Sequence, residues 1–137
     1  MKYKHIAWDW NGTLLDDRCL CIEAINHILK SRKMALVSNE KYRNLFCFPV
    51  IKYYEKLGFD FTIEHFPIPE FLEYYKNGFE KCYLHNDAEF VLRRIKELGF
   101  NHLIDFHAEN KTAYPTPNII GVYIIRYEKE HSTKTGK

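Results

Sequence analysis

The sequence has 137 residues, of which 46% are hydrophobic, enough for one buried core and at most a small second lobe. Twenty basic and eighteen acidic residues are interleaved, and the formal net charge is only +2. This balance argues against a nucleic-acid binder and against a protein that docks on an anionic membrane, but it is compatible with a small anionic ligand. No segment approaches the roughly 20 apolar residues of a membrane span or begins like a signal peptide, so a cytoplasmic protein is expected.

Cysteine and histidine positions give no sign of a metal centre. The four cysteines, at positions 19, 21, 47 and 82, form no CxxC pair, and no histidine lies at ligand spacing from them. Reduced thiols are therefore the favoured interpretation over disulfides. The seven histidines are scattered along the chain, and isolated histidines of this kind are more often surface or core residues than catalytic ones.

The first structural signal is a short apolar run that stops at a turn. Ile6-Ala7-Trp8 leads into Asp9, and Asn11-Gly12 follows at once, as is typical of a buried strand that ends in a turn. Asp9 is then expected at the carboxyl end of the strand. Open parallel α/β sheets bind their ligands outside this end, so the position of Asp9 favours a functional role.

Apolar periodicity predicts a series of helices after this strand. Leu72, Tyr75 and Phe79 are expected to share one face of the fourth helix. Asn86 and Glu89 have the spacing of a capping box at the start of the fifth. The helices are predicted over residues 18–33, 39–46, 49–57, from 69 onward, and over 87–98, with a loop over 59–68.

The last third of the sequence changes character. Residues 100–104 predict a second buried strand, and residues 119–127 alternate loosely like a further strand. Residues 1–104 contain twelve leucines, whereas residues 105–137 contain none. In proportion to length the final segment would hold roughly four. The tail from about Asp105 is therefore expected to diverge from the rest of the chain.

The segment around Asp9 suits phosphoryl transfer. The Asp9 carboxylate can attack phosphorus and form an aspartyl-phosphate, which divides a difficult hydrolysis into two steps. Gly12 lets the backbone turn sharply toward phosphate oxygens, and Thr13 offers a hydroxyl and an N–H. A Mg²⁺ ion held by Asp9 and a nearby carbonyl would neutralise charge between the nucleophile and the phosphate. The alternative is an ordinary turn, because Asn-Gly and Asp-x-Asn are favoured wherever a strand reverses.

Three stretches of the sequence carry a family resemblance. The segment WDWNGTLLDD, residues 8–17, resembles the first signature of the haloacid dehalogenase superfamily. FCFPV at 46–50 and YYEKLGFDF at 53–61 resemble the helical cap that follows this signature in phosphoglycolate-phosphatase-like members. Leu84-His85 and the helix that ends at Leu98-Gly99-Phe100 resemble the return from cap to core. Together the resemblance covers about residues 3–104.

The resemblance implies both a fold and a chemistry. The fold would be a Rossmann-like α/β core, incomplete in this chain, made of residues 1–15 and 85–137, with an inserted α-helical cap over 16–84. The activity would be Mg²⁺-dependent hydrolysis of a phosphate monoester of a small, phosphoglycolate-like metabolite. Asp9 would be the nucleophile and a metal ligand, and Asn11 would occupy the second catalytic position and bind the metal through its backbone carbonyl. Gly12 and Thr13 would lie beside the phosphate.

The sequence also departs from the family pattern. Position 11 is usually a second Asp, which exchanges a proton with the substrate, and Asn11 has none to exchange near neutral pH. Residues 103–107 offer no Ser or Thr for the second motif, and Lys111 is a weak candidate for the third-motif lysine. An alternative is therefore a truncated or frameshifted, non-catalytic remnant that at most binds phosphate or a partner. An incomplete sheet would also expose apolar edges, which predicts self-association.

Overall fold

The chain divides into an α/β unit, Met1–Asp16 with Leu84–Lys137, and a helical unit, Asp17–Tyr83. The computed structural model describes residues 4–106 and 122–126. The chain passes between the two units through the short strands β2 (Leu15–Asp16) and β3 (Tyr83–Leu84), which pair as a two-stranded sheet. None of the helices in the described ranges has both the length and the apolar character needed to cross a membrane.

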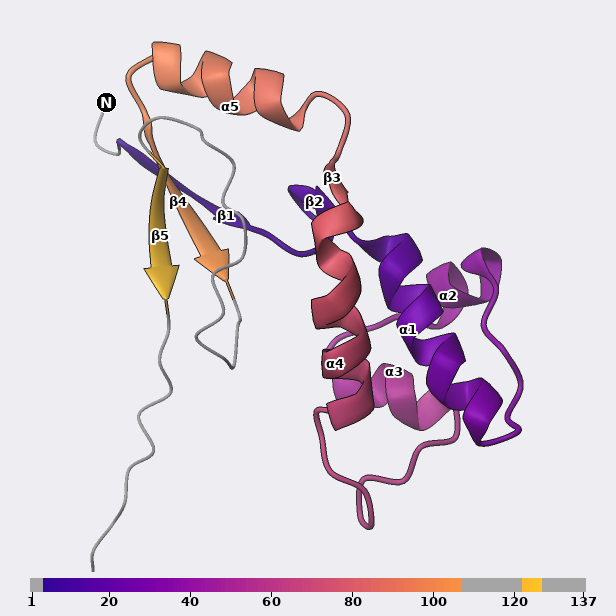
Figure 1. The fold of residues 1–137 in the computed structure, drawn as a ribbon. Coiled ribbons are helices and arrows are strands. Elements are labelled where there is room, and N and C mark those ends of the chain that lie inside the picture. Colours follow the sequence, from indigo (N-terminus) through magenta and orange to yellow (C-terminus); the bar gives the residue numbers. More distant parts are fainter. Residues whose placement is uncertain (1–3, 107–121, 127–137) are drawn as a thin grey trace, which may run out of the picture. The chain divides into compact units, whose positions relative to one another are not determined.

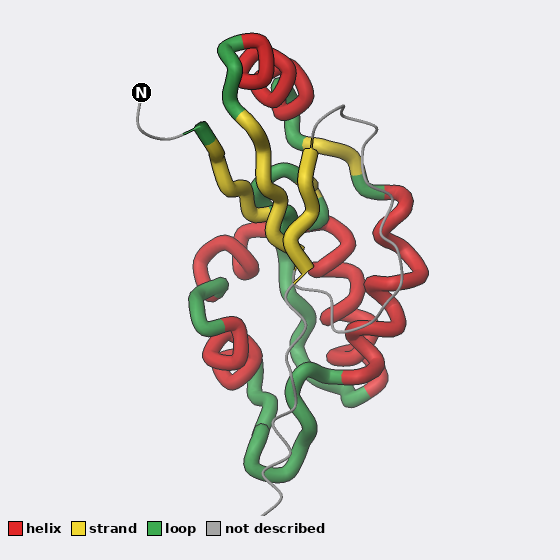
Figure 2. Tube along the Cα trace, turned by 90° about the vertical axis from the view of Figure 1, so that its left-hand side faces the viewer, coloured by secondary structure: helices red, strands yellow, loops and turns green. Residues whose placement is uncertain are grey.

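A parallel sheet forms the centre of the α/β unit. Strands β1 (His5–Asp9), β4 (Asn101–Phe106) and β5 (Val122–Arg126) lie in the order β1-β4-β5, and both pairings are parallel (Figures 1 and 2). The predicted strands over 100–104 and 119–127 are therefore confirmed, with shifted ends. The register of β1 and β4 places Ile6 opposite His102 and Asp9 opposite Asp105.

Helix α5 (Ala88–Glu97) packs against β4 and buries one side of the sheet. The side chains of Leu92 and His102 are fully buried, and Ile104 is nearly so. His102 and Ile104 are two residues apart on β4, so they point to the same face. Apolar contact between this face and Leu92 holds the helix on the sheet.

The predicted capping box at the start of α5 is wrong. The residue that precedes the helix is Asp87, not Asn86, and its backbone lies in the left-handed region with φ of 67°. In this geometry the Asp87 side chain makes no capping hydrogen bond. The carboxylate of Glu89 instead binds the guanidinium of Arg93 one turn further along the helix.

The helical unit contains α1 (Arg18–Ser31), α2 (Asn39–Leu45), α3 (Val50–Lys56), α4 (Pro69–Gly78) and the 3₁₀ turn η1 (Phe79–Lys81). All four α-helices were predicted, with ends that differ by at most two residues. The hydroxyl of Ser38 accepts the Lys41 N–H and caps α2. Gly58, with φ of 100°, ends the turn after α3, a conformation that glycine adopts without strain.

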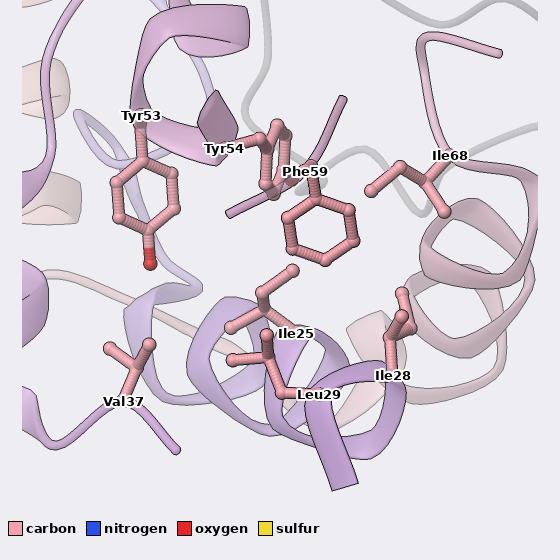
Figure 3. Packing of buried hydrophobic residues seen from close by; sticks show 8 residues of the cluster. All are labelled: Ile25, Ile28, Leu29, Val37, Tyr53, Tyr54, Phe59 and Ile68. Carbon is pink, nitrogen blue, oxygen red and sulfur yellow. The ribbon is translucent and has the colours of Figure 1, made fainter. Parts of the chain in front are cut away.

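The core of the helical unit is a cluster of apolar and aromatic side chains (Figure 3). Tyr54 has the most ring neighbours, with centroids 5.4 Å from Tyr53, 5.8 Å from Phe59 and 5.9 Å from Phe71. We call this set the helical core. Its buried members are Ile25, Ile28, Leu29, Val37, Tyr53, Tyr54, Phe59 and Ile68.

Helix α4 differs in two ways from its predicted packing. Tyr75 and Phe79 are buried as expected, but Leu72 is 39% exposed, and Phe71 packs against the helical core. Gly78 lies where α4 approaches α1, because a Cβ there would be 2.5 Å from Cδ1 of Leu20. Glycine therefore allows a close approach of the two helices, although its intrinsic helix propensity is poor.

Candidate functional site

The side chain of Asp9 is exposed at the last position of β1. Along this strand the half-buried residues Ile6 and Trp8 alternate with the exposed residues His5, Ala7 and Asp9. Successive side chains of a strand point to opposite faces, so the face that carries Asp9 is opposite the face that carries Trp8. Asp9 thus lies at the carboxyl end of a parallel strand, on the more exposed face of the described sheet.

A tight turn follows Asp9 and is organised by one carbonyl oxygen. The carbonyl of Trp10 accepts the N–H groups of Thr13, Leu14 and Leu15 at 3.3, 3.1 and 2.9 Å. The side chains of Trp10, Leu14 and Leu15 are buried. These buried side chains hold the two ends of the turn in place. Asn11, Gly12 and Thr13, which lie between them in the sequence, are exposed.

Gly12 is required by backbone conformation rather than by space. Its φ is 74°, in the left-handed region, and its N–H donates to the carbonyl of Leu15 at 3.0 Å. A Cβ at this position would meet no atom within 4 Å. Side chains larger than hydrogen would thus fit sterically, but they would strain the turn.

Thr13 folds back on Asp9. Its hydroxyl donates to Oδ2 of Asp9 at 2.8 Å, so it fixes the orientation of the carboxylate. The sequence analysis suggested the Thr13 N–H as a phosphate contact. In the structure this N–H donates to the carbonyl of Trp10, which accepts three N–H groups of the turn. The four candidate residues, Asp9, Asn11, Gly12 and Thr13, therefore occupy one continuous exposed turn.

His102 is a residue of this unit that sequence reasoning missed. Its Nδ1 accepts the indole N–H of Trp8 at 2.9 Å, and its Nε2 lies 2.9 Å from the carbonyl oxygen of Leu92. The imidazole is fully buried. The sequence did contain an indication of its role, because His102 lies in the middle of the strand predicted over 100–104. A polar side chain that is buried there must find hydrogen-bond partners.

In the described part of the chain, no group of three or more His, Cys, Asp or Glu side chains gathers. The carboxylate of Asp9 and the backbone of Asn11 are the candidate donors nearest the turn. Lys111, the candidate for the third-motif lysine, lies outside the described residues. The four cysteines form no disulfide bonds with one another.

Several solved structures share this fold. The chain is similar to CbbY from Rhodobacter sphaeroides in complex with phosphate (16% identity, TM-score 0.54), with 74% of this chain and 50% of that chain covered. A predicted phosphatase from Clostridium acetobutylicum gives 20% identity and a TM-score of 0.54, with 74% and 48% covered. A predicted phosphoglycolate phosphatase from Haemophilus somnus 129PT gives 17% and 0.51, with 76% and 51% covered. The chain therefore spans about half the length of these proteins.

Sequence comparison identifies the family more directly. No curated protein sequence matches the chain. The family model of the haloacid dehalogenase-like hydrolases, however, matches residues 6–133. The match continues past Asp105, and β5 lies parallel to β4 in this later segment, so the chain beyond residue 105 retains a strand of the sheet. The mixed α/β fold and the family match agree, and the chain belongs to the haloacid dehalogenase-like hydrolases.

Proposed function

We propose that this hydrolase acts on the phosphate monoester of a small metabolite and that Asp9 is its nucleophile. The observation that carries the proposal is the exposed Asp9 carboxylate at the carboxyl end of β1, with the Thr13 hydroxyl 2.8 Å from its Oδ2. A phosphoglycolate-like substrate is the finer proposal. It is supported by the fold that the chain shares with a predicted phosphoglycolate phosphatase, and the helical unit would serve as the cap.

The first chemical step is a displacement at phosphorus. Thr13 holds Oδ2 of Asp9, so the other carboxylate oxygen, Oδ1, would attack. A new bond forms between this oxygen and phosphorus while the bond from phosphorus to the ester oxygen breaks. In the second step, water attacks the aspartyl-phosphate and releases inorganic phosphate and the Asp9 carboxylate. Gly12 allows the backbone of the turn to lie close to the phosphate.

Asn11 sets the limit on the rate of both steps. An amide has no proton to give to the departing ester oxygen and cannot take one from the attacking water near neutral pH. The departing group must therefore leave as an anion or take its proton from solvent. We expect turnover to be slow for alkyl phosphates and faster for esters of acidic alcohols, whose anions leave without help.

Two protein ligands fit a magnesium ion that arrives together with the phosphate. Mg²⁺ commonly takes one or two carboxylates plus substrate phosphate oxygens and water rather than a complete protein cage. The Asp9 carboxylate and the Asn11 carbonyl would hold it here. When bound, the ion would neutralise part of the phosphate charge that opposes the approach of Asp9.

The test uses p-nitrophenyl phosphate, because its leaving group is a stabilised anion and needs no proton donor. With Mg²⁺ present we expect slow turnover by the unchanged protein. Asp9→Asn keeps the size of the side chain and should abolish turnover. Asn11→Asp restores an acid and base at this position and should raise the rate by about 10²-fold or more. Turnover that persists in Asp9→Asn would contradict the proposal.

A non-catalytic role is the second candidate, and it rests on Asn11, which has no proton to exchange near neutral pH. In that case the chain would bind phosphate or a partner without hydrolysing an ester. Well-folded protein, both unchanged and with Asn11→Asp, would then show no turnover.

A further inference from the structure

We infer that His102 is a positioning residue for the Asp9 carboxylate and acts through the indole ring of Trp8. The inference rests on the proposed function of Asp9 as nucleophile and adds a residue from a distant part of the sequence. Two hydrogen bonds carry it: Trp8 Nε1 to His102 Nδ1, and His102 Nε2 to the carbonyl of Leu92, each at 2.9 Å.

The donors and acceptors fix the protonation of the imidazole. An indole N–H can only donate, so Nδ1 of His102 must be the acceptor and carries no proton. The proton of the neutral ring is then on Nε2, which donates to the carbonyl oxygen of Leu92. Both ring nitrogens of this fully buried side chain are therefore satisfied, which offsets the cost of removing a polar ring from water.

This arrangement joins three elements of the α/β unit. His102 lies on β4, Trp8 on β1 and Leu92 on α5. The rings of Trp8 and His102 are tilted by 43°, with their centroids 6.1 Å apart. An apolar residue at position 102 could fill the same space but could not fix the rotation of the Trp8 ring, because only a hydrogen bond specifies direction.

Because Trp8 is next to Asp9 in the sequence, the hydrogen bond that holds the Trp8 side chain also affects the position of Asp9. Trp8 directly precedes Asp9, and in the described sheet β1 pairs on one side only, with β4. Trp10 follows Asp9 and is buried. Asp9 therefore lies between two fixed tryptophans, and the bond from Trp8 to His102 is the side-chain contact that secures the strand side. Loss of this bond should let the backbone at Asp9 shift without unfolding the turn, so that the carboxylate, still held at Oδ2 by Thr13, moves away from its original position.

The variants separate the hydrogen bond from packing. His102→Phe keeps a ring at this position but removes both ring nitrogens. Trp8→Phe keeps an aromatic ring but removes the indole N–H and makes the ring system smaller. His102→Asn restores an acceptor where Nδ1 lies and is the conservative rescue. Ile104→Val is the packing control, because Ile104 is buried on the same face of β4, lies opposite Trp8 in the strand register and has no hydrogen-bonding group in its side chain.

Carbon-13 NMR of the Asp9 carboxyl group in the free, full-length protein gives the first measurement. We expect its resonance to move in His102→Phe and Trp8→Phe, and to stay near its original position in His102→Asn and Ile104→Val. An unchanged Asp9 resonance in both phenylalanine variants would overturn the inference, as would an equal displacement in Ile104→Val. Trp8→Phe keeps the test available if His102→Phe does not fold.

Kinetics with p-nitrophenyl phosphate and Mg²⁺ give the second measurement. The phenylalanine variants should lower kcat about tenfold or more with little change in KM, since a misdirected nucleophile harms the reacting geometry more than binding. A rise in KM alone would count against a positioning role. Absence of turnover in the unchanged protein would refute the proposed function, and the Asp9 resonance would still decide whether His102 positions this carboxylate.

Discussion

The two units of the chain differ in where their buried surface lies. The helical core draws its side chains from α1, α3 and the loops between helices, and its largest members are aromatic. In the described part of the α/β unit, α5 covers one side of the sheet, and His5, Ala7 and Asp9 on β1 are exposed. The comparison indicates that packing is concentrated in the helical unit, whereas the residues proposed for chemistry lie on the less covered unit.

This difference has a physical basis in the two kinds of element. Amphipathic helices bury their apolar stripes against one another and complete a core from consecutive sequence. A parallel sheet needs strands that are distant in the sequence and cover on both faces. A chain that spans about half the length of similar structures can therefore hold a well-packed helical unit as well as a sheet on which, in the described residues, α5 packs. Self-association through the sheet edges stays a prediction.

The largest effect is expected from Tyr54→Ala in the helical core. This residue packs against the rings of Tyr53, Phe59 and Phe71, and its loss should lower the free energy of unfolding of the helical unit by about 3–5 kcal/mol. Denaturant titration followed by far-ultraviolet circular dichroism measures this change.

Phe48→Ala is the matched control for that experiment. Phe48 is also aromatic and belongs to the helical unit, but 81% of its side chain is exposed. Its removal should change the free energy of unfolding by no more than about 0.5 kcal/mol. Equal losses from Tyr54→Ala and Phe48→Ala would contradict the assignment of stability to the helical core.

Alkaline pH is expected to lower the free energy of unfolding of the helical unit by a smaller amount. Burial raises the pKa of the Cys21 thiol and of the Tyr54 and Tyr75 hydroxyls above their ordinary values of 9.0 and 10.0, and for Tyr75 a hydrogen bond to Asp17 adds to the shift. Because the folded unit keeps these protons longer than the unfolded chain does, the stabilisation is complete below the ordinary pKa values. It is lost as pH rises through the raised ones.

The measurement is the free energy of unfolding from about pH 8 to about pH 11. The tyrosinate absorbance that Tyr54→Phe and Tyr75→Phe each remove should appear together with loss of helical circular dichroism rather than before it. Tyr75→Phe removes one of the titrating groups and should make the decline less steep. Ionisation of Tyr54 or Tyr75 at the ordinary pKa in the fully helical protein would show that these hydroxyls are more accessible than the packing of the helical unit indicates.

The smallest effect on the free energy of unfolding is expected from substitutions at the first residues of two helices, one in each unit. Ser38 caps α2 through its hydroxyl, so Ser38→Ala should destabilise the helical unit by about 1 kcal/mol. The sequence pattern of α5 suggests a similar role for Asn86, but the structure has Asp87 before the helix without a side-chain cap. Asn86→Ala should therefore leave the unfolding free energy within about 0.5 kcal/mol of its original value. A loss equal to that of Ser38→Ala would restore the capping-box interpretation.

The helices and the candidate site could be predicted from the sequence, because both depend on residues that are close together in the chain. The helices follow from apolar periodicity, and the candidate site is one continuous segment, so spacing alone brought Asp9, Gly12 and Thr13 together. The left-handed backbone of Asp87 and the close approach at Gly78 depend on chain geometry that periodicity does not encode. The Trp8–His102 bond joins residues 94 positions apart, and only the register of β1 on β4 brings them within reach.

The placement of tryptophan gives the chain a built-in optical reporter. Its two tryptophans, Trp8 and Trp10, flank Asp9, while its ten tyrosines are spread over the sequence and several belong to the helical core. Emission excited selectively from indole therefore comes entirely from the neighbours of the proposed nucleophile. The intensity and wavelength of this emission will thus follow events at Asp9 without any added label.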